Sequence, residues 1–317
     1  MPDAVKSSRL RRQPGKPLPP TRRTARIEAP WSLRASRGVE VLELAPLRDL
    51  AWLVHGFSTR SGGASVLASG QRVLNLGFTE WDKPEAVRRN RGTFQSALGA
   101  DDLTLVPLSQ FHSAVVRSVP PVSDRPSKGD ASATDKAGFL LAVQTADCVP
   151  ILLVDPETRA VAAIHAGWRG TLARIAEKTV GQMRMRFGSN PKHLIAAIGP
   201  SIGACCYEVG TELVTMFTSR FADAEEWFDE LRTGDEPNPL EWLNMKPPGH
   251  QPPPKNVRLD LPKANRAQLL AAGLGEKNLY LSGLCTSCHT DLFFSYRKEA
   301  GQSGRLLSAV GRKSQRR

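Results

Sequence analysis

The sequence predicts an α/β fold built as a single domain, with a mixed sheet and flanking helices. The first observation is a series of short apolar runs, typical of strands, that Gly, Asp and Pro separate from Ala51 onward. The second is a set of amphipathic helical patterns that alternate with such runs from Thr171 onward. With 317 residues, the chain is long enough to bury a sizeable core.

Six runs are expected to form strands, because each is short, apolar and bounded by turn-forming residues. They are residues 53–57, 103–108, 139–143, 149–154, 161–165 and 194–198. Helices are expected at residues 171–187, 211–221 and 262–273. The first has apolar residues at helical intervals, and the last opens at Pro262 and closes at Gly273, which suit a first-turn and a C-terminal capping position.

The domain is expected to cover residues 38–311, followed by a short basic tail at residues 312–317. Residues 1–37 are rich in Pro and Arg and show no sustained periodicity, so a disordered basic tail is expected there. Residues 233–256 contain seven prolines, too many for a helix or an interior strand. We expect this stretch to be a surface insertion of the domain.

The formal net charge of +12 lies at the two ends of the chain. Residues 1–37 contain ten Lys and Arg against two acidic residues, and residues 297–317 contain seven against one. A folded nucleic-acid-binding protein carries such charge on a structured face with stacking aromatic residues nearby. We therefore expect no specific nucleic-acid partner. Weak contact of the tails with anionic polymers or membrane surfaces is the alternative.

No apolar stretch approaches the roughly 18 residues of a membrane span, and the N-terminus lacks the apolar core of a secretory signal. The five cysteines are an odd number, which favours reduced thiols over a disulfide framework. These features predict a cytoplasmic protein with no membrane partner. A monomer or a homodimer is expected.

Three potential metal ligands, His112, Cys148 and His165, stand at the ends of predicted strands. Metal ligation requires such groups to converge on one point, and strand ends can bring them together. Two His and one Cys would leave the fourth tetrahedral position open for water or substrate, as in catalytic zinc sites. A lone His in an apolar strand is more often a core residue, so spacing alone leaves both interpretations open.

The same residues also fit a cysteine nucleophile. Cys148 would be activated by His165 as general base, with Asp147 or a backbone group orienting the ring. A thiolate beside a histidine is reactive, whereas a thiolate on zinc is largely committed to the metal. The two interpretations therefore predict different alkylation chemistry.

The other four cysteines are two adjacent residues, Cys205 and Cys206, and a Cys-x-x-Cys pair, Cys285 and Cys288. Together they suggest a structural four-cysteine zinc site. Adjacent cysteines chelate one tetrahedral ion poorly, however, and a second Cys-x-x-Cys pair is missing. Buried or incidental thiols are therefore expected here.

Two segments could bind anions. The loop at residues 58–65 combines Arg60 with hydroxyls and glycines, which can surround phosphate or ribose oxygens. Arg169 directly precedes the first predicted helix, whose N-terminal backbone N–H groups could also meet an anion, although a simple helix cap explains this segment as well. Neither a Gly-x-Gly-x-x-Gly motif after a strand nor a P-loop motif is present, so dinucleotide-binding and P-loop assignments have no support.

Nine segments together resemble one family, the bacterial laccase-domain proteins, which are known as polyphenol oxidases and purine nucleoside phosphorylases. The segments occur in the family's order over about 250 residues: HGFSTRSGGAS (55–65), LNLGF (74–78), SQFHS (109–113), QTADCVPILLVD (144–155), AAIHAGWRGT (162–171), IGPSIGACCYEVG (198–210), LDLPKANRAQLLAAG (259–273), GLCT (283–286) and FFSYRKEAGQSGR (293–305).

This resemblance implies a single α/β domain of the type shared with cysteine deamidase toxins. It implies a zinc ion at His112, Cys148 and His165. It also implies phosphorolysis of adenosine, inosine, guanosine and methylthioadenosine to the base and ribose 1-phosphate, with phosphate as co-substrate, and deamination of adenosine. Cys148 and His165 are then expected to act in catalysis as well as in metal binding.

Four further residues are assigned by combining the resemblance with their chemistry. Arg60 and Arg169 are the candidates for binding phosphate, and Asn75 is the candidate for hydrogen bonds to ribose or purine. Asp147, next to Cys148, is expected to support a ligand or to carry a proton. Each of these residues also has a structural explanation: a turn for Asn75, a strand-end cap for Asp147 and surface ion pairs for the arginines.

A count of histidines tests the older oxidase name. A multicopper laccase needs a type 1 copper and a trinuclear cluster, which take on the order of ten His and one Cys. This chain has six His in all, so copper is not expected. The leading hypothesis is a zinc-dependent purine nucleoside phosphorylase with adenosine deaminase activity. The alternatives are a metal-free hydrolase or amidase that uses Cys148 and His165, and an anionic-polymer-binding protein that acts through its basic tails.

Overall fold

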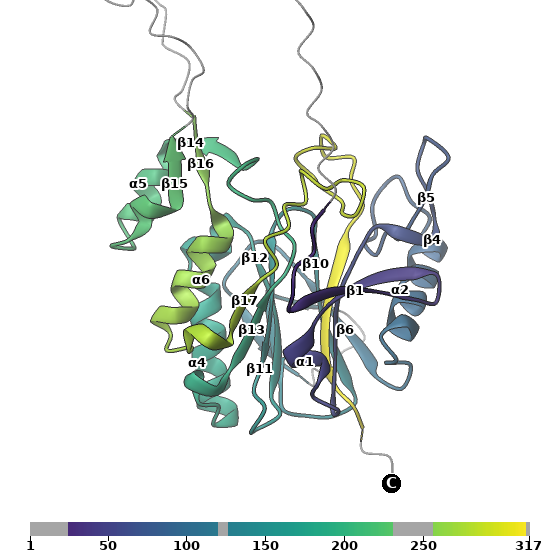
Figure 1. Ribbon diagram of the computed structural model, residues 1–317, viewed down its shortest axis with the longest axis horizontal. Coiled ribbons are helices and arrows are strands. Elements are labelled where there is room, and N and C mark those ends of the chain that lie inside the picture. The colour runs from purple at the N-terminus through teal and green to yellow at the C-terminus, as the bar shows by residue number, and fades with distance from the viewer. Residues whose placement is uncertain (1–24, 120–125, 231–255, 315–317) are drawn as a thin grey trace, which may run out of the picture.

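Two large mixed sheets pack face to face, and helices cover their outer faces (Figure 1). The structure is a computed structural model that describes residues 25–119, 126–230 and 256–314. The predicted α/β class, with mixed sheets and flanking helices, is confirmed, and the strands are divided between two principal sheets. Within the described ranges, none of the helices has the length and apolar character needed to cross a membrane.

The first sheet has seven strands, and its centre is formed by segments far apart in the chain. Parallel pairing occurs between β10 and β6 and between β6 and β8, and the other pairs are antiparallel. The strands, in spatial order, are β1 (Trp31–Ser36), β2 (Val39–Leu44), β3 (Leu53–Ser58), β18 (Leu306–Arg312), β10 (Phe139–Thr145), β6 (Thr104–Ser109) and β8 (Ser127–Lys128).

The second sheet has six strands and is also mixed, with parallel pairs at both of its edges. In spatial order it contains β17 (Leu279–Leu281), β13 (Ile195–Ile198), β11 (Val149–Val154), β12 (Val161–Ala166), β9 (Ala131–Thr134) and β7 (Val116–Ser118). Two small sheets complete the strands: β14 (Glu208–Gly210), β16 (Asn256–Leu259) and β15 (Phe228–Glu230) in one, and β4 (Ser61–Val66) and β5 (Arg72–Val73) in the other.

The helices form the outer layers. α4 and α6 lie together over the six-stranded sheet, and α2 lies on the opposite side of the molecule (Figure 1). The α-helices are α1 (Ala45–Arg48), α2 (Pro84–Ala97), α3 (Trp168–Leu172), α4 (Ile175–Phe187), α5 (Glu212–Thr218) and α6 (Leu261–Ala271), and short 3-10 turns occur at Pro191–His193, Ala224–Trp227 and Glu276–Asn278.

Alternation along the central strands explains the layers, because successive side chains of a strand point to opposite faces. In β10, Leu141 and Val143 face the core between the two sheets, whereas Leu140 and Ala142 face the core shared with α2. β11 divides in the same way between the core among the sheets and the core beneath α4 and α6. A strand with two buried faces appears in the sequence as a continuous apolar run. For this reason the ranges of the central strands could be predicted closely from the sequence.

The helix expected at residues 171–187 is divided into α3 and α4. Arg174, between them, has a left-handed backbone with φ of 62°, which interrupts the regular helix although the apolar spacing continues. The other two predicted helices are present as α5 and α6. In α6 the side chain of Asp260 caps the first turn by accepting a hydrogen bond from the N–H of Lys263 at 2.9 Å.

The folded part begins earlier than predicted. β1 lies inside the stretch expected to be a disordered tail of residues 1–37, and this expectation is wrong for residues 31–36. Trp31 is buried, and its ring lies 5.6 Å from that of Phe57, so a strand forms despite the surrounding arginines. Likewise Arg312, expected in the C-terminal tail, is the last residue of β18. Residues 1–24, 315–317 and nearly all of the predicted insertion at 233–256 lie outside the described residues.

The topology brings three loops to one edge of the sheets. β6 and β10 are parallel, so the loop after Ser109 and the turn after Thr145 leave from the same edge. This turn, residues 146–148, leads directly from β10 in one sheet to β11 in the other. His165, near the end of β12, pairs with Pro150 at the start of β11, which brings the end of β12 to the same place.

Candidate metal centre

His112, Cys148 and His165 converge at this edge, and we call them the His–Cys cluster. Their ligand atoms all lie within 4.8 Å of one another, and Cys148 Sγ is 3.8 Å from Nε2 of His112. The two imidazole rings are 4.9 Å apart and meet edge to face. The three residues come from three separate elements, so the tertiary fold brings the predicted ligands together.

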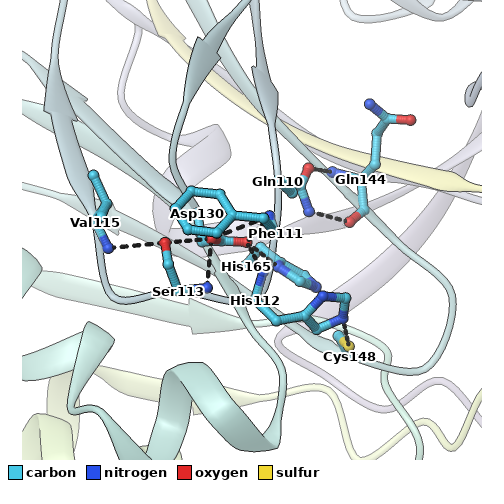
Figure 2. Close-up of polar contacts among 9 residues, drawn as sticks. All are labelled: Gln110, Phe111, His112, Ser113, Val115, Asp130, Gln144, Cys148 and His165. Atoms are coloured by element: carbon cyan, nitrogen blue, oxygen red, sulfur yellow. Dashed lines mark hydrogen bonds and ion pairs between the residues drawn. The ribbon is translucent and has the colours of Figure 1, made fainter.

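A buried carboxylate organises the cluster. Asp130 is fully buried, and its Oδ1 lies 2.8 Å from Nδ1 of His165 (Figure 2). The N–H groups of His112 and Ser113 also donate to this carboxylate, at 3.0 and 2.7 Å, and the Ser113 hydroxyl donates at 2.6 Å. One side chain thus fixes the loop that carries His112 and the ring of His165. Such a partner holds a metal-ligating histidine in one tautomer and leaves Nε2 to face the metal.

Charge interactions within the cluster outweigh the effect of burial. Burial opposes ionisation of Cys148, but the positive charge of His165 and a hydrogen bond with His112 lower the pKa of the thiol to about 6. Burial disfavours the charged form of His165, but the Cys148 thiolate and the Asp130 carboxylate raise its pKa to about 9. Burial raises the pKa of Asp130, but hydrogen bonds from His165 and Ser113 outweigh burial and lower this pKa below its usual range. Without a metal, the cluster therefore favours a thiolate beside an imidazolium.

The backbone around the cluster is constrained. His112 and Asp147 both have positive φ, 61° and 88°, in a region that non-glycine residues rarely adopt. Gly167, the N-cap residue directly before α3, lies close to the His–Cys cluster: a Cβ there would come 2.9 Å from the ring of His112 and 3.0 Å from Cys148 Sγ. The backbone of residue 167 thus approaches the ligands closely because it carries no side chain.

The cluster fits a metal ion by its donors and their spacing. In a tetrahedral zinc site, bonds of about 2.0–2.3 Å place a nitrogen and a sulfur ligand about 3.5 Å apart. The distance of 3.8 Å between Cys148 Sγ and His112 Nε2 is close to this value. Three protein ligands leave a fourth position open, which is the donor count of a catalytic zinc site.

A cavity of about 780 Å³ opens over the cluster and is lined by all three of its residues. Its wall also carries the aromatic side chains of Phe78, Tyr207 and Tyr296. The cavity is also lined by Arg169, Arg297 and Arg305. The central carbon of each guanidinium group lies over an aromatic ring, 4.2 to 5.6 Å from its centroid. The cavity thus combines flat apolar surfaces with positive charge.

Two further predicted residues, Asp147 and Arg169, also line this cavity. Asp147 does not orient the His165 ring, because Asp130 does so, and the carboxylate oxygens of Asp147 accept hydrogen bonds from Thr286 Oγ1 and the Arg297 N–H, both at 2.6 Å. Among the described residues, Arg169 makes no ion pair, and its guanidinium lies 4.2 Å from the Trp168 ring. Of the two predicted phosphate-binding arginines, it is the one that faces the cavity.

Arg60 and Asn75 lie elsewhere and hold the fold together. The buried guanidinium of Arg60 donates to the Thr290 carbonyl at 2.7 Å and to Glu299 at 2.9 Å. Asn75 is fully buried, and its amide donates to Asp82 at 2.7 Å and accepts from the Arg305 N–H at 2.9 Å. Neither lines the cavity. The expectation that both bind substrate directly is therefore not supported by their positions.

Three functional candidates escaped the sequence interpretation. Asp130 could have been found as the acidic residue directly before the short run that forms β9, because a metal-ligating histidine commonly has a carboxylate partner. Arg297 and Arg305 lie in the segment FFSYRKEAGQSGR, whose charge was counted with the basic C-terminal end of the chain, residues 297–317. Nothing in their spacing indicates that this segment lines the cavity, since tertiary packing brings it there.

Comparisons with known proteins agree with this geometry. The chain is 40% identical over 260 residues to a purine nucleoside phosphorylase of Deinococcus radiodurans, covering 81% of this chain and 88% of that protein. It is 38% identical over 184 residues, 58% of this chain and 62% of the relative, to the adenosine deaminase RL5 of an unknown prokaryotic organism. The crystal structure of YfiH from Bacillus licheniformis matches with a TM-score of 0.76 at 30% identity, covering 90% of this chain and 100% of that one.

The family model described as "Multi-copper polyphenol oxidoreductase laccase" matches residues 54–313, which include the whole His–Cys cluster and every residue that lines the cavity. Enzyme names are attached to the curated relatives of the chain. This chain belongs to the multi-copper polyphenol oxidoreductase laccase family.

Proposed function

We propose that this protein is a zinc-dependent purine nucleoside phosphorylase that also deaminates adenosine. The observation that carries the proposal is the His–Cys cluster at a cavity of about 780 Å³ with aromatic and cationic walls. The names of two relatives, a purine nucleoside phosphorylase and an adenosine deaminase, support the two activities. The substrates expected are adenosine, inosine, guanosine and methylthioadenosine.

The donor set supports zinc rather than a copper cluster. Two imidazoles, one thiolate and an open fourth position are the ligands of a single catalytic zinc ion. The six histidines of the chain are too few for a type 1 copper and a trinuclear cluster, which take on the order of ten. Zinc in this cluster would supply Lewis-acid polarisation and a lowered pKa for water.

In phosphorolysis, a phosphate oxygen forms a bond to C1′ of the ribose while the bond from C1′ to the purine nitrogen breaks. The purine leaves with the electron pair of that bond and takes up the proton that the hydrogenphosphate loses. The guanidinium groups of Arg169, Arg297 and Arg305 are the cations that can hold the phosphate in the cavity. The rings of Phe78, Tyr207 and Tyr296 supply flat apolar surfaces against which a purine can stack.

In deamination, the oxygen of a water molecule forms a bond to C6 of adenine, and ammonia leaves from the same carbon. This step requires a group that moves a proton from the water to the leaving nitrogen. Asp147 lies in the cavity wall and is the nearest carboxylate in sequence to Cys148. We assign this proton transfer to Asp147 Oδ1 or Oδ2. The Thr286 hydroxyl and the Arg297 N–H position the carboxylate.

Alanine substitutions of the ligands test the proposal. We expect His112→Ala, Cys148→Ala and His165→Ala each to abolish both activities while circular dichroism shows a retained fold. Chromatography of adenosine incubated with and without phosphate provides the assay: adenine and ribose 1-phosphate should form only with phosphate, and inosine in both cases. A fully active ligand variant would contradict the proposal.

A second pair of variants separates the two predicted arginines. Arg169→Gln should raise the KM for phosphate about tenfold, because it removes a cation that faces the cavity. Arg60→Gln should lower the melting temperature and leave the KM for phosphate unchanged, since its guanidinium is paired with Glu299 outside the cavity. A raised KM for phosphate in Arg60→Gln, with an unchanged KM in Arg169→Gln, would instead indicate that Arg60 binds phosphate.

One observation favours a second function, a metal-free hydrolase or amidase. A thiolate at Cys148, an imidazolium at His165 and a carboxylate at Asp130 form a chain of the kind that activates cysteine nucleophiles. In this case chelated, correctly folded protein would keep its activity and lose it completely to iodoacetamide. If the zinc enzyme is correct, chelation alone removes turnover and added zinc restores it.

A further inference from the structure

The remaining four cysteines come together at a second place in the fold. Cys205 and Cys206 lie in the loop after β13, and Cys285 and Cys288 lie in the loop after β17. β13 and β17 are parallel partners, with Ile198 opposite Leu281, so both loops leave from the same edge of the six-stranded sheet. A bridge between Ser201 and Cys285 continues this pairing into the loops. We call this set of four cysteines the four-cysteine cluster.

The sulfur spacing is that of metal ligands. All four sulfurs lie within 4.8 Å of one another, and Cys288 Sγ is 3.5 Å from the sulfurs of both Cys205 and Cys206. A disulfide would require about 2.05 Å. In a tetrahedral site with zinc–sulfur bonds of about 2.3 Å, the sulfurs are about 3.8 Å apart. The observed distances are near this value.

Adjacent cysteines usually chelate one tetrahedral ion poorly, but the turn at residues 203–207 brings the sulfurs of Cys205 and Cys206 to the same side. The N–H groups of Cys206 and Tyr207 both donate to the Gly203 carbonyl, at 2.9 and 3.0 Å, which folds the chain tightly on itself. In this turn the sulfurs of Cys205 and Cys206 both reach Cys288. The Gly203 N–H also donates to Cys285 Sγ at 3.3 Å, a backbone contact that stabilises negative charge on sulfur.

We propose that Cys205, Cys206, Cys285 and Cys288 bind one structural Zn²⁺ ion, at a second site separate from the His–Cys cluster. Four thiolates complete a tetrahedral coordination sphere and leave no position for substrate, which is the pattern of structural zinc. The proposal is independent of the reaction at the His–Cys cluster, because it rests only on these four side chains and the two loops that carry them.

The two loops joined by this ion support a wall of the cavity. The Thr286 hydroxyl donates to Asp147 at 2.6 Å, and the Ile202 N–H donates to the Asp147 carbonyl at 2.9 Å. Thr286 stands between the two cysteines of one loop, and Ile202 precedes the cysteines of the other. An ion that binds all four thiols would therefore fix two of the hydrogen-bond partners of Asp147, the residue next to Cys148. The four cysteines are positioning residues in this account.

Metal content measured by mass spectrometry, on full-length protein purified without a metal-affinity tag, tests the proposal. We expect about two zinc ions per chain in the natural sequence, one at each cluster. The combined variant His112→Ala, Cys148→Ala and His165→Ala should keep about one zinc, and Cys285→Ser with Cys288→Ser should also keep about one. Ser287→Ala, in the same loop but without a thiol change, is the matched control and should keep both.

The variant of the His–Cys cluster keeps the test decisive even if the cysteine variant fails to fold. If that folded variant contains no zinc, or contains iron instead, the proposal is overturned. Cobalt added anaerobically to its metal-free form should give the intense thiolate-to-cobalt absorption of a four-sulfur site, and weak absorption would also overturn it. Titration in denaturant should find five free thiols in the natural protein; a disulfide among the four cysteines would contradict a resident zinc ion.

Discussion

The two clusters of potential metal ligands use similar side chains in opposite ways. The His–Cys cluster has three ligands and lines a cavity of about 780 Å³. The four-cysteine cluster has four ligands, all sulfur, and joins two loops. A tetrahedral ion in the first would keep one position for water or substrate, whereas an ion in the second would have all four positions filled by protein sulfurs. Donor number and surroundings thus separate a site for chemistry from a site for stability within one chain.

The backbone shows the same contrast. Near the His–Cys cluster, His112 and Asp147 adopt positive φ, and the buried Asp130 carboxylate collects several donors. None of the four cysteines in the second cluster has positive φ. Unfavourable backbone conformations are retained where the surrounding structure over-determines them, and they concentrate at functional sites. Positive φ also occurs away from both clusters, as at Arg174, so the contrast concerns only the two clusters: the first contains such residues and the second does not.

Among substitutions outside the His–Cys cluster itself, the largest effect is expected from Gly167→Ala. The added Cβ would lie 2.9 Å from the His112 ring and 3.0 Å from Cys148 Sγ, so the ligands must shift. A misplacement of about 1 Å can reduce turnover about 10²-fold, and we expect a loss of at least this size together with loss of one zinc ion. Phosphorolysis rates and metal content measure both.

Gly181→Ala is the matched control for this substitution. Gly181 lies inside α4, and a Cβ there meets no atom within 4 Å. Activity should be unchanged, and the free energy of unfolding should rise by about 0.5–1 kcal/mol. Full activity in Gly167→Ala would show that the close approach of this backbone to the ligands has no functional role.

A smaller and selective effect is expected from Asp130→Asn. The amide keeps the size of the side chain but removes the charge that holds His165 at 2.8 Å. Loss of such a partner costs about 10–100-fold in metal affinity. Competition with a chromophoric chelator should show this loss for one zinc ion per chain, while the second zinc ion, in the four-cysteine cluster, keeps its affinity. An equal loss of affinity for both zinc ions would contradict the distinction between the two clusters.

Alkylation of metal-free protein should distinguish Cys148 from the two exposed cysteines of the second cluster, Cys205 and Cys288, by the pKa of their thiols; Cys285, whose pKa is lowered to about 4, is buried and is left out of this comparison. The thiolate is the reactive form, and the pKa of Cys148 is lowered to about 6. Hydrogen bonds to other cysteines and burial raise the pKa of Cys205, and burial raises that of Cys288 to about 11. At pH 7, iodoacetamide should therefore modify Cys148 before the more exposed Cys205 and Cys288.

The pH dependence gives a second check on this order. Below about pH 6, the rate at Cys148 should fall about tenfold for each pH unit, because the thiolate fraction falls in this way. Peptide mass spectrometry after short exposure gives the rate at each cysteine. Faster modification of Cys205 or Cys288 at pH 7 would contradict the charge arrangement described for the His–Cys cluster.

The smallest effect is expected from removal of residues 1–24. The residues of both clusters and of the cavity wall all lie between positions 78 and 305, so turnover and zinc content should stay within about twofold of the natural protein. If the chain instead acts by binding anionic polymers through its basic tail, retention on heparin should fall with no change in turnover. Removal of residues 1–37 is a poor test, because it deletes β1 and the buried Trp31.

Local patterns allowed the central strands and the three residues of the His–Cys cluster to be predicted. The ranges of β11 and β12 follow from continuous apolar runs, and His112, Cys148 and His165 stand where such runs end. What could not be predicted depends on pairings between distant segments. Asp130 reaches His165 because β9 pairs with β12, and the four cysteines meet because β13 pairs with β17. Neither strand pairing can be inferred from the spacing of residues in the sequence.

Charge was the least informative signal. In the sequence, Arg60 and Arg169 look equivalent, because each is a cation in a glycine-containing loop. Packing places the first against Glu299, the Thr290 carbonyl and the Phe294 ring, and the second in the cavity wall. Arg305, which was attributed to a basic end of the chain, is half-buried and lines the cavity because Asn75 holds its backbone N–H. Solvation and pairing of a charged side chain are properties of the tertiary structure.

The position of β18 has a consequence for protein synthesis. This strand is the most C-terminal element of the seven-stranded sheet, yet it lies between β3 and β10, to which it is antiparallel. Until it leaves the ribosome, the sheet has a gap, and two strand edges with unpaired backbone groups face each other. A nascent chain that stops before Leu306 therefore cannot close its central sheet, and we expect truncated translation products to depend on chaperones or proteases for their removal.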